Sequence, residues 1–184
     1  MSKEISLDEI KKIWPEKAPD INIVHKYVSK YEKEKIVIKY GGNVLIDRKV
    51  FNNFISDIYV LNKLGLSIIV VHGGGPRIKR ELDKKKIVSK FINGLRVTDK
   101  HIIDTVEDVL IDFNKDIVNS LKNLGSETAS FHSKNDNIIE VEPEKEELGF
   151  VGIPRKINVN LIEDALNKNK IPIISPLGLG KNNQ

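Results

Sequence analysis

The sequence has no cysteine, a single methionine, a single tryptophan and no long apolar run. Without cysteine the chain can form neither a disulfide nor a thiolate metal site, and it has no thiol nucleophile. A transmembrane helix is not expected, because no stretch of about 18 consecutive apolar residues is present. The first ten residues, MSKEISLDEI, lack the apolar core of a signal peptide. We therefore expect a cytoplasmic protein with no membrane partner.

The sequence also lacks a large net charge of either sign. The net charge is only +4 over 184 residues, and the lysines are scattered among aspartates and glutamates. We expect no nucleic-acid partner, because no basic stripe interleaved with aromatic residues is present. A modest positive field would still favour the arrival of a phosphorylated or carboxylated small molecule. With 40% hydrophobic residues, the chain can bury the core of one domain, or of one and a half.

Glycine is concentrated after two short apolar runs. The run 36–40 (IVIKY) precedes Gly41 and Gly42, and the run 68–71 (IIVV) precedes His72 and the glycines at 73–75. Between them, 50–64 has the apolar spacing of a helix. This pattern predicts a βαβ unit with parallel, neighbouring strands. Both glycine turns then lie at the carboxyl ends of adjacent strands, where open α/β sheets bind ligands.

The second glycine turn leads into Pro76 and a charged helical pattern. Proline fits the first turn of a helix, and glycines without a Cβ let a ligand approach the main chain. A helix N-terminus offers free N–H groups and the positive end of the helix dipole. The stretch therefore predicts either an anion site or a plain tight turn.

Two cations accompany these turns. Lys39 lies inside the first apolar run, where it either points to water from an edge strand or reaches a phosphate over the glycine turn. Arg96 follows the turn dipeptide Asn93-Gly94, and its guanidinium could grip a carboxylate or form a surface ion pair. His72 is expected to hydrogen-bond locally, and we assign no metal ligand.

The remaining segments complete an alternating α/β pattern. We divide the chain into an N-terminal helical extension, 1–34, with expected caps at Ser6 and Asp20, and an α/β domain, 35–184. The extension either packs on its own domain or reaches a neighbouring subunit. We expect a helix over 99–124 capped by Thr98, strands over 128–132 and 138–141 joined by a turn at 135–137, a strand over 151–159, a helix over 160–169 and a buried strand over 171–175.

Taken together, the stretches IVIKYGGNVL, IIVVHGGGPRI and FINGLRVTD resemble the amino acid kinase family, and in particular its members that act on N-acetyl-L-glutamate in arginine biosynthesis. The resemblance continues through Asn114-Lys115, LGFVGIPRKINV and IPIISPLGLG, so it covers nearly everything from Ile36 onward. It implies a three-layer αβα sandwich with a mainly parallel central sheet, of which this chain forms the N-terminal half.

The resemblance also implies a reaction, the transfer of the γ-phosphoryl group of ATP to the side-chain carboxylate of N-acetylglutamate. Because no covalent enzyme intermediate is involved, catalysis would consist of positioning and charge stabilisation. Mg²⁺ would accompany ATP, with no protein ligand assigned. The implied site residues are Lys39 on the transferring phosphoryl group; Gly41, Gly42 and Gly73, with Lys39, beside the ATP phosphates; Gly74 and Gly75 against the acetylglutamate; and Arg96 on its α-carboxylate.

Two features depart from the family pattern. Ser133 and Asp136 stand where members commonly carry glycines, so we expect a different hairpin beside the substrate. Members also run on into a nucleotide-binding half, so we expect this chain to be the acceptor-binding half, with little kinase activity in isolation. The N-terminal helix is similar to one that interlaces dimers into hexamers in arginine-inhibited members, which implies a homo-oligomer, either a dimer or a hexamer.

Two other functions stay open. The chain could be a non-enzymatic amino-acid-binding or regulatory module that keeps Arg96 but lacks a competent ATP site. It could also be a related kinase acting on carbamate, aspartate or uridylate, although NGLRVT after HGGGP argues against that.

Overall fold

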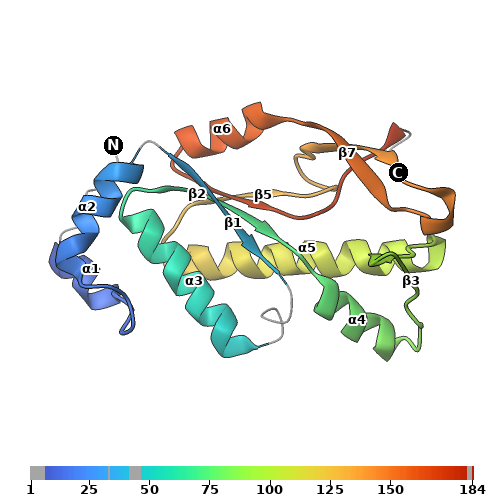
Figure 1. The fold of residues 1–184 in the computed structure, drawn as a ribbon, viewed down its shortest axis with the longest axis horizontal. Helices are drawn as coiled ribbons and strands as arrows, with labels where there is room; N and C mark the ends of the chain where they lie inside the picture. The colour runs from blue at the N-terminus through green and yellow to red at the C-terminus, as the bar shows by residue number, and fades with distance from the viewer. Residues whose placement is uncertain (1–6, 33, 42–46, 182–183) are drawn as a thin grey trace.

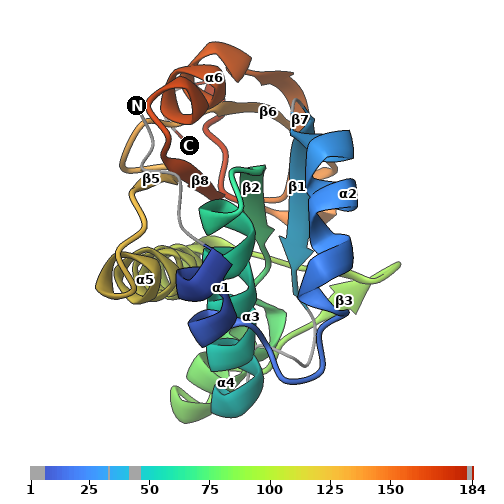
Figure 2. The same cartoon turned by 90° about the vertical axis from the view of Figure 1, so that its left-hand side faces the viewer.

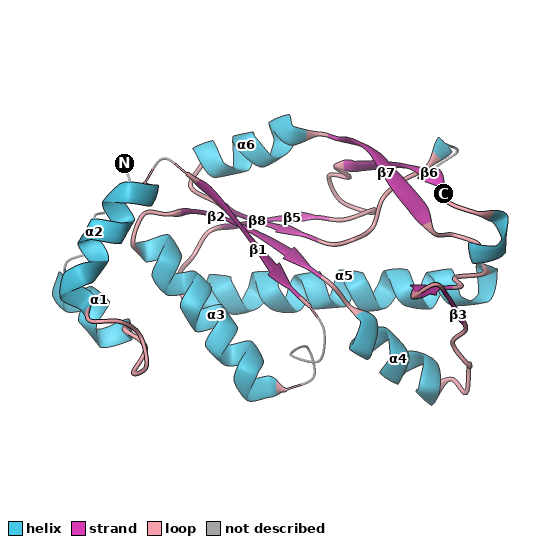
Figure 3. Cartoon of the chain, in the orientation of Figure 1, coloured by secondary structure: helices cyan, strands magenta, loops and turns pink. Residues whose placement is uncertain are grey.

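The computed structural model describes residues 7–32, 34–41, 47–181 and 184 (Figure 1). Within these residues the chain has an α/β fold, built on a four-stranded parallel sheet that is accompanied by two small antiparallel sheets. Helices cover both faces of the central sheet, as the colouring by secondary structure makes plain (Figure 3). The expected three-layer α/β fold with a mainly parallel sheet is confirmed.

The central sheet has the strand order β1–β2–β8–β5. Lys39 of β1 lies opposite Val71 of β2, and Val70 lies opposite Ile173 of β8. Every residue of β8 is buried, because this inner strand is covered on both faces. The strands run β1 Lys35–Tyr40, β2 Ser67–His72, β5 Thr128–Phe131 and β8 Ile171–Ile174.

One face of the sheet is covered by α3 (Arg48–Lys63) and α5 (Lys100–Asn123). Ile58 of α3 and Phe113 of α5 are fully buried in the core that these helices form with the sheet. Because α3 connects β1 to the parallel strand β2, the predicted βαβ unit is confirmed. The turns after β1 and β2 are therefore neighbours at the same edge of the sheet.

The opposite face is covered by α6 (Val159–Asn167), which forms the third layer (Figure 1). Ala165 of α6 packs with Ile69 and Ile174 of the sheet in a separate apolar cluster. After β2 the chain forms α4 (Gly75–Lys84), whose Ile78 packs against α5. Pro76 lies in the first turn of α4, as predicted.

The N-terminal segment forms α1 (Leu7–Ile13) and α2 (Ile21–Tyr31), which lie along one side of the domain (Figure 2). Asp20 caps α2, since its side chain accepts a hydrogen bond of 2.9 Å from the backbone N–H of Asn22. The expected cap at Ser6 lies outside the described residues. The domain boundary at 34/35 stays a prediction.

The strands expected over 128–132 and 138–141 are present, but they do not pair with each other. Strand β5 joins β8 in the central sheet, whereas β6 (Ile139–Pro143) pairs antiparallel with β7 (Gly152–Ile157). Burial explains this difference in pairing. Both ends of β5 are buried, so it suits a place beside the fully buried β8, whereas β6 carries exposed glutamates that suit the surface. The chain between them turns at 132–135, where His132 and Asn135 exchange two backbone hydrogen bonds.

The expected cap of the long helix is also wrong by one residue. Asp99, not Thr98, is the N-cap of α5, and its carboxylate accepts hydrogen bonds from the N–H groups of His101 and Ile102. A carboxylate is favoured there by the helix dipole. Thr98 is instead buried, and its backbone pairs with the N–H of Phe150 and the carbonyl of Leu148.

No helix in the described part of the chain combines the length and the apolar character that a membrane crossing requires.

Candidate functional site

The glycine turns after β1 and β2 lie in contact with each other. The backbone N–H of Gly73 donates a hydrogen bond of 2.7 Å to the carbonyl oxygen of Tyr40, which continues the ladder past the ends of the strands. A Cβ placed on Gly73 would lie 3.7 Å from the Cα of Gly41, an ordinary van der Waals contact. Gly42 lies outside the described residues. The sheet thus brings two main-chain turns to one point.

The glycines at 74 and 75 have different surroundings. Gly74 is buried and is the N-cap of α4, and a Cβ there would collide with the Leu110 side chain of α5. Gly75 is the exposed first residue of α4, and the position of its Cβ has no neighbour within 4 Å among the described residues. Packing against Leu110 therefore favours glycine at 74, whereas glycine at 75 leaves the helix N-terminus open to an approaching anion.

Lys39 projects from the face of β1 on which α6 lies. Strand alternation places Lys35 on the same face, and its ammonium pairs with Glu163 of α6 at 2.6 Å. Nearer the glycine turn, Val37 (62% exposed) and Lys39 are not covered by α6. Among the described residues, Lys39 has no hydrogen bond or ion pair. Its side chain is therefore free to reach a ligand above the turn.

A buried polar network lies beneath the glycine turns. His72 is 1% exposed, and its Nδ1–H donates to the carbonyl oxygen of Gly73 at 2.9 Å. This direction follows because a carbonyl can only accept, which leaves Nε2 to accept from the side-chain amide of Asn114 at 3.2 Å. Burial lowers the pKa of His72 to about 4, although the hydrogen bond to Gly73 opposes the shift. His72 is therefore a neutral anchor of the turn at physiological pH.

Asn114 joins three strands to this turn. Its amide also donates to the carbonyl oxygen of Ile173 in β8 at 3.0 Å, and its side-chain oxygen accepts from the Ser130 hydroxyl of β5 at 2.5 Å. The local hydrogen bond of His72 was predicted, but its partner Asn114 was not. An asparagine among the apolar, inward positions of α5 is the signal that could have pointed to it.

Arg96 is presented by a tight hairpin formed by β3 (Phe91–Ile92) and β4 (Leu95–Arg96). The two linking residues have positive φ angles, 48° at Asn93 and 82° at Gly94, as the predicted Asn-Gly turn requires. The guanidinium of Arg96 contacts the Ser89 hydroxyl and lies 4.7 Å from the centre of the Phe91 ring. Burial lowers the pKa of Arg96, and the charge of Asp83 opposes this shift.

The structure thus does not bring all the predicted residues into contact. The N–H of Gly73 bonds to the carbonyl of Tyr40, which directly precedes Gly41, and Gly74 and Gly75 continue from Gly73 into α4. In the described part of the chain no hydrogen bond joins Arg96 to either turn. Arg96 belongs to the β3–β4 hairpin. Figure 1 shows β3 beside the N-terminal end of α5.

The sequence is similar to known proteins of one family. The model of the amino acid kinase family matches residues 34–184. The chain belongs to the amino acid kinase family. It is 50% identical over 96% of its length to an acetylglutamate kinase from Pelagibacter ubique (strain HTCC1062), of which it covers 62%. It is 34% identical over 93% of its length to an acetylglutamate kinase from Rhodospirillum centenum, of which it covers 61%. The chain thus spans about three fifths of the length of these curated relatives.

Solved structures give the same fold for this amino acid kinase chain. The crystal structure of smu.665 from Streptococcus mutans UA159 is 31% identical and superposes with a TM-score of 0.70, covering 79% of this chain and 59% of that one. N-acetylglutamate synthase from Neisseria gonorrhoeae, solved with coenzyme A and L-arginine, has a TM-score of 0.72 at 18% identity, covering 89% of this chain and 40% of that one. At that identity, the second likeness concerns the fold alone.

Proposed function

We propose that this chain is the acceptor-binding part of a kinase that transfers the γ-phosphoryl group of ATP to the side-chain carboxylate of N-acetyl-L-glutamate. The observation that carries the proposal is the hydrogen bond from the N–H of Gly73 to the carbonyl of Tyr40, which holds the starts of the two turns together where α4 begins at Gly75. Two main-chain turns and a helix N-terminus at one edge suit a reaction in which two anionic reactants must meet. Similarity to proteins named acetylglutamate kinase supports this choice of acceptor.

The donor side of the site is assigned to Lys39, Gly41 and Gly73, together with Gly42 outside the described residues. An exposed ammonium with no described partner suits the stabilisation of charge on a transferring phosphoryl group. No atom of the described residues lies within 4 Å of the Cβ position of Gly41, which allows a phosphate oxygen to approach the main chain. ATP would supply the phosphoryl group.

Mg²⁺ would enter with ATP. No group of three histidines, aspartates or glutamates among the described residues could hold a metal ion. The phosphates of ATP would therefore be the main ligands that this part of the site offers the ion.

The acceptor side is assigned to Gly74, Gly75 and Arg96. The free N–H groups of the first turn of α4 would face the reacting carboxylate, where they stabilise negative charge. The Arg96 fork would hold the α-carboxylate in two parallel hydrogen bonds. Because Ser89 and Phe91 already hold the guanidinium, it would lose little rotational freedom on binding.

The N-terminal extension, 1–34, is proposed as the contact with further copies of this chain. Val28 of α2 packs on the main core, whereas Ile23, Tyr27 and Tyr31, each four residues apart, are exposed. An apolar stripe on the outer face of a helix is costly to leave in water and is typical of an oligomer contact. A dimer or hexamer and a cytoplasmic location stay predictions.

The test is calorimetric titration of this chain with N-acetyl-L-glutamate and, separately, with ATP and Mg²⁺, for the wild type, Arg96→Ala and Arg96→Lys. Removing one partner of a buried, charged contact costs about 2–5 kcal/mol, so Arg96→Ala should weaken acetylglutamate binding by about 30-fold or more. Arg96→Lys should recover part of the affinity, since it restores the charge without the planar fork.

Arg155→Ala is the matched control, because it removes an exposed guanidinium that pairs with Glu142 on the β6–β7 sheet. Arg155→Ala should bind N-acetyl-L-glutamate with the affinity of the wild type. Equal binding by Arg96→Ala and the wild type would show that the acceptor site is wrongly assigned. A folded chain that binds neither ligand would contradict the proposal that this part of the protein contains a preformed acceptor site.

A further inference from the structure

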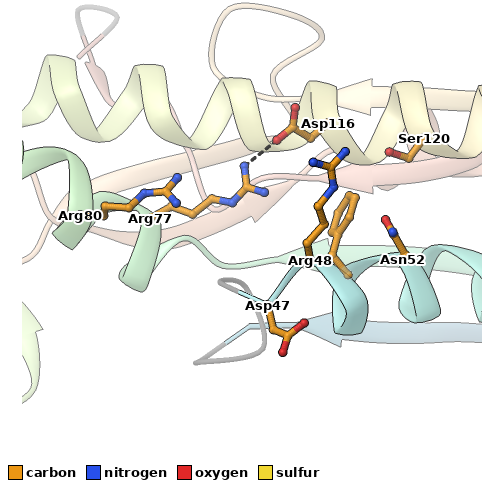
Figure 4. Close-up of a pocket in the computed structure, with 8 residues that line it drawn as sticks. Asp47, Arg48, Asn52, Arg77, Arg80, Asp116 and Ser120 are labelled. Carbon is orange, nitrogen blue, oxygen red and sulfur yellow. Dashed lines mark hydrogen bonds and ion pairs between the residues drawn. The ribbon is translucent and has the colours of Figure 1, made fainter.

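Three arginines line a pocket of about 350 Å³ between helices α3, α4 and α5. Arg48 comes from the first turn of α3, Arg77 and Arg80 come from α4, and α5 contributes Asp116. Arg48 and Arg77 extend from different helices toward the same side of α5 (Figure 4). The pocket does not include Lys39 among its lining residues, nor any described glycine of the two turns.

Arg77 is held in place by two contacts. Its guanidinium donates to a carboxylate oxygen of Asp116 at 2.6 Å, and its central carbon lies 4.0 Å from the centre of the Phe113 ring. The side chain is only 21% exposed. One wall of the pocket therefore holds a guanidinium in a fixed position, with its charge balanced by Asp116.

Both acidic groups of the pocket are already in use. Asp47 caps α3, where its carboxylate accepts hydrogen bonds from the backbone N–H groups of Lys49 and Val50 at 2.7 and 3.0 Å. Asp116 is paired with Arg77. Arg48 and Arg80, in contrast, have no hydrogen bond or ion pair with any residue that the structure describes. The pocket therefore has more positive charge than its own carboxylates balance.

We propose that this pocket binds a small, phosphate-bearing anion at a site separate from the glycine turns. Guanidinium groups match the oxygens of a phosphate in paired hydrogen bonds, and two guanidiniums without an ion pair among the described residues complement a doubly charged ligand. The amide of Asn52 and the hydroxyl of Ser120 add neutral donors to the lining. The volume lies in the range of small-molecule sites and exceeds what one phosphate fills, which leaves room for an organic part beside the Phe51 ring.

The bound anion would tie α3 to α4. Because Arg77 follows Gly75 by two residues on the same helix, occupancy would hold the N-terminus of α4 in place. A bound anion would therefore also limit the movement of the second glycine turn, which leads directly into α4. This proposal does not depend on the reaction assigned to that turn.

The probe is inorganic pyrophosphate without Mg²⁺, titrated into the chain by calorimetry at constant ionic strength. Arg48→Gln and Arg80→Gln each remove one charged set of donors and should weaken pyrophosphate binding about 10- to 150-fold. Neither side chain has a described partner, so both variants should unfold in urea at the wild-type midpoint. Hydrogen exchange with pyrophosphate present should slow at 48–52 and 77–80.

Two controls separate this site from other cationic groups. Arg155→Gln makes the same chemical change on β7 and should leave binding unaltered. Lys39→Gln should leave in place the pyrophosphate binding that depends on Arg48 and Arg80, because Lys39 does not line this pocket. The proposal is overturned if Arg48→Gln and Arg80→Gln bind as the wild type does, if Arg155→Gln weakens binding equally, or if Lys39→Gln abolishes it.

Discussion

The backbone N–H of Gly73 lies 2.7 Å from the carbonyl oxygen of Tyr40, and this hydrogen bond joins the two glycine turns. The contact is made by the sheet ladder itself and not by side chains. The buried side chains of His72 and Asn114 support the second turn from below. The position of the turns therefore depends on burial and main-chain pairing, which can be tested apart from ligand binding.

Replacing Gly75 by alanine should weaken ligand binding without harming the fold. The new methyl group would meet no described atom within 4 Å, and alanine is the better helix former, so the free energy of unfolding should stay within about 1 kcal/mol of the wild type. The methyl would occupy the space through which an anion reaches the N–H groups of α4. Calorimetry with N-acetyl-L-glutamate, beside urea denaturation, measures both effects.

Gly74→Ala is the matched comparison, and unlike Gly75→Ala it should lower the free energy of unfolding. Its methyl group would collide with the Leu110 side chain, and overpacking of this kind costs about 1–3 kcal/mol of unfolding free energy. If Gly75→Ala proved the more destabilising of the two, the packing described for α4 would be wrong.

Folding stability should fall as the pH is lowered from about 6.5 toward 4, partly because of His72. Burial lowers the pKa of the folded-state ring to about 4, so in this interval the unfolded chain binds a proton that the folded chain does not. Above pH 6.5 the neutral His72 contributes about 3 kcal/mol to the free energy of unfolding. This contribution is lost as the pH falls to about 4.

Urea denaturation between pH 7.5 and 5 measures this dependence. His72→Gln, which cannot be protonated, should show a flatter dependence than the wild type, because the other titrating groups are common to both proteins. If the free energy of unfolding changed with pH to the same extent in both proteins, a buried, neutral His72 would be contradicted.

Replacing Asn114 by alanine should destabilise the fold by about 2–4 kcal/mol. The change leaves the Nε2 of His72 and the carbonyl of Ile173 without this partner in a fully buried site, and it also removes the acceptor of the half-buried Ser130 hydroxyl. Asn119→Ala, on the exposed side of the same helix, should stay within about 0.5 kcal/mol of the wild type. Equal midpoints for both variants in a urea titration would show that the network contributes nothing.

Lys39→Gln should leave the midpoint of urea unfolding unchanged, because the exposed ammonium has no described partner. It should weaken the binding of ATP with Mg²⁺, since a compact positive charge beside the phosphates is lost. Calorimetry on the two proteins decides the matter. A destabilised variant with unchanged ATP binding would assign Lys39 to the fold and not to the site.

Local features of the sequence were the easiest to predict. The βαβ unit from 36 to 71, the Asn93-Gly94 turn and the cap at Asp20 each depend on residues close together in the chain. The cap at Thr98 failed because a neighbouring carboxylate, Asp99, is the stronger acceptor at a helix N-terminus. Choosing between two adjacent caps needs the backbone angles, which the sequence does not contain.

The sequence by itself determined the order of strands and helices, the positions of the glycine turns and the family resemblance. Only the tertiary structure decided that β8 lies between β2 and β5, and that β6 leaves the central sheet to pair with β7. It alone brought Asn114 to His72, 42 residues away, and Arg48 into one pocket with Arg77. The physical reason is that periodicity and turn residues act over a few positions, whereas strand order and pockets depend on which buried surfaces fit together.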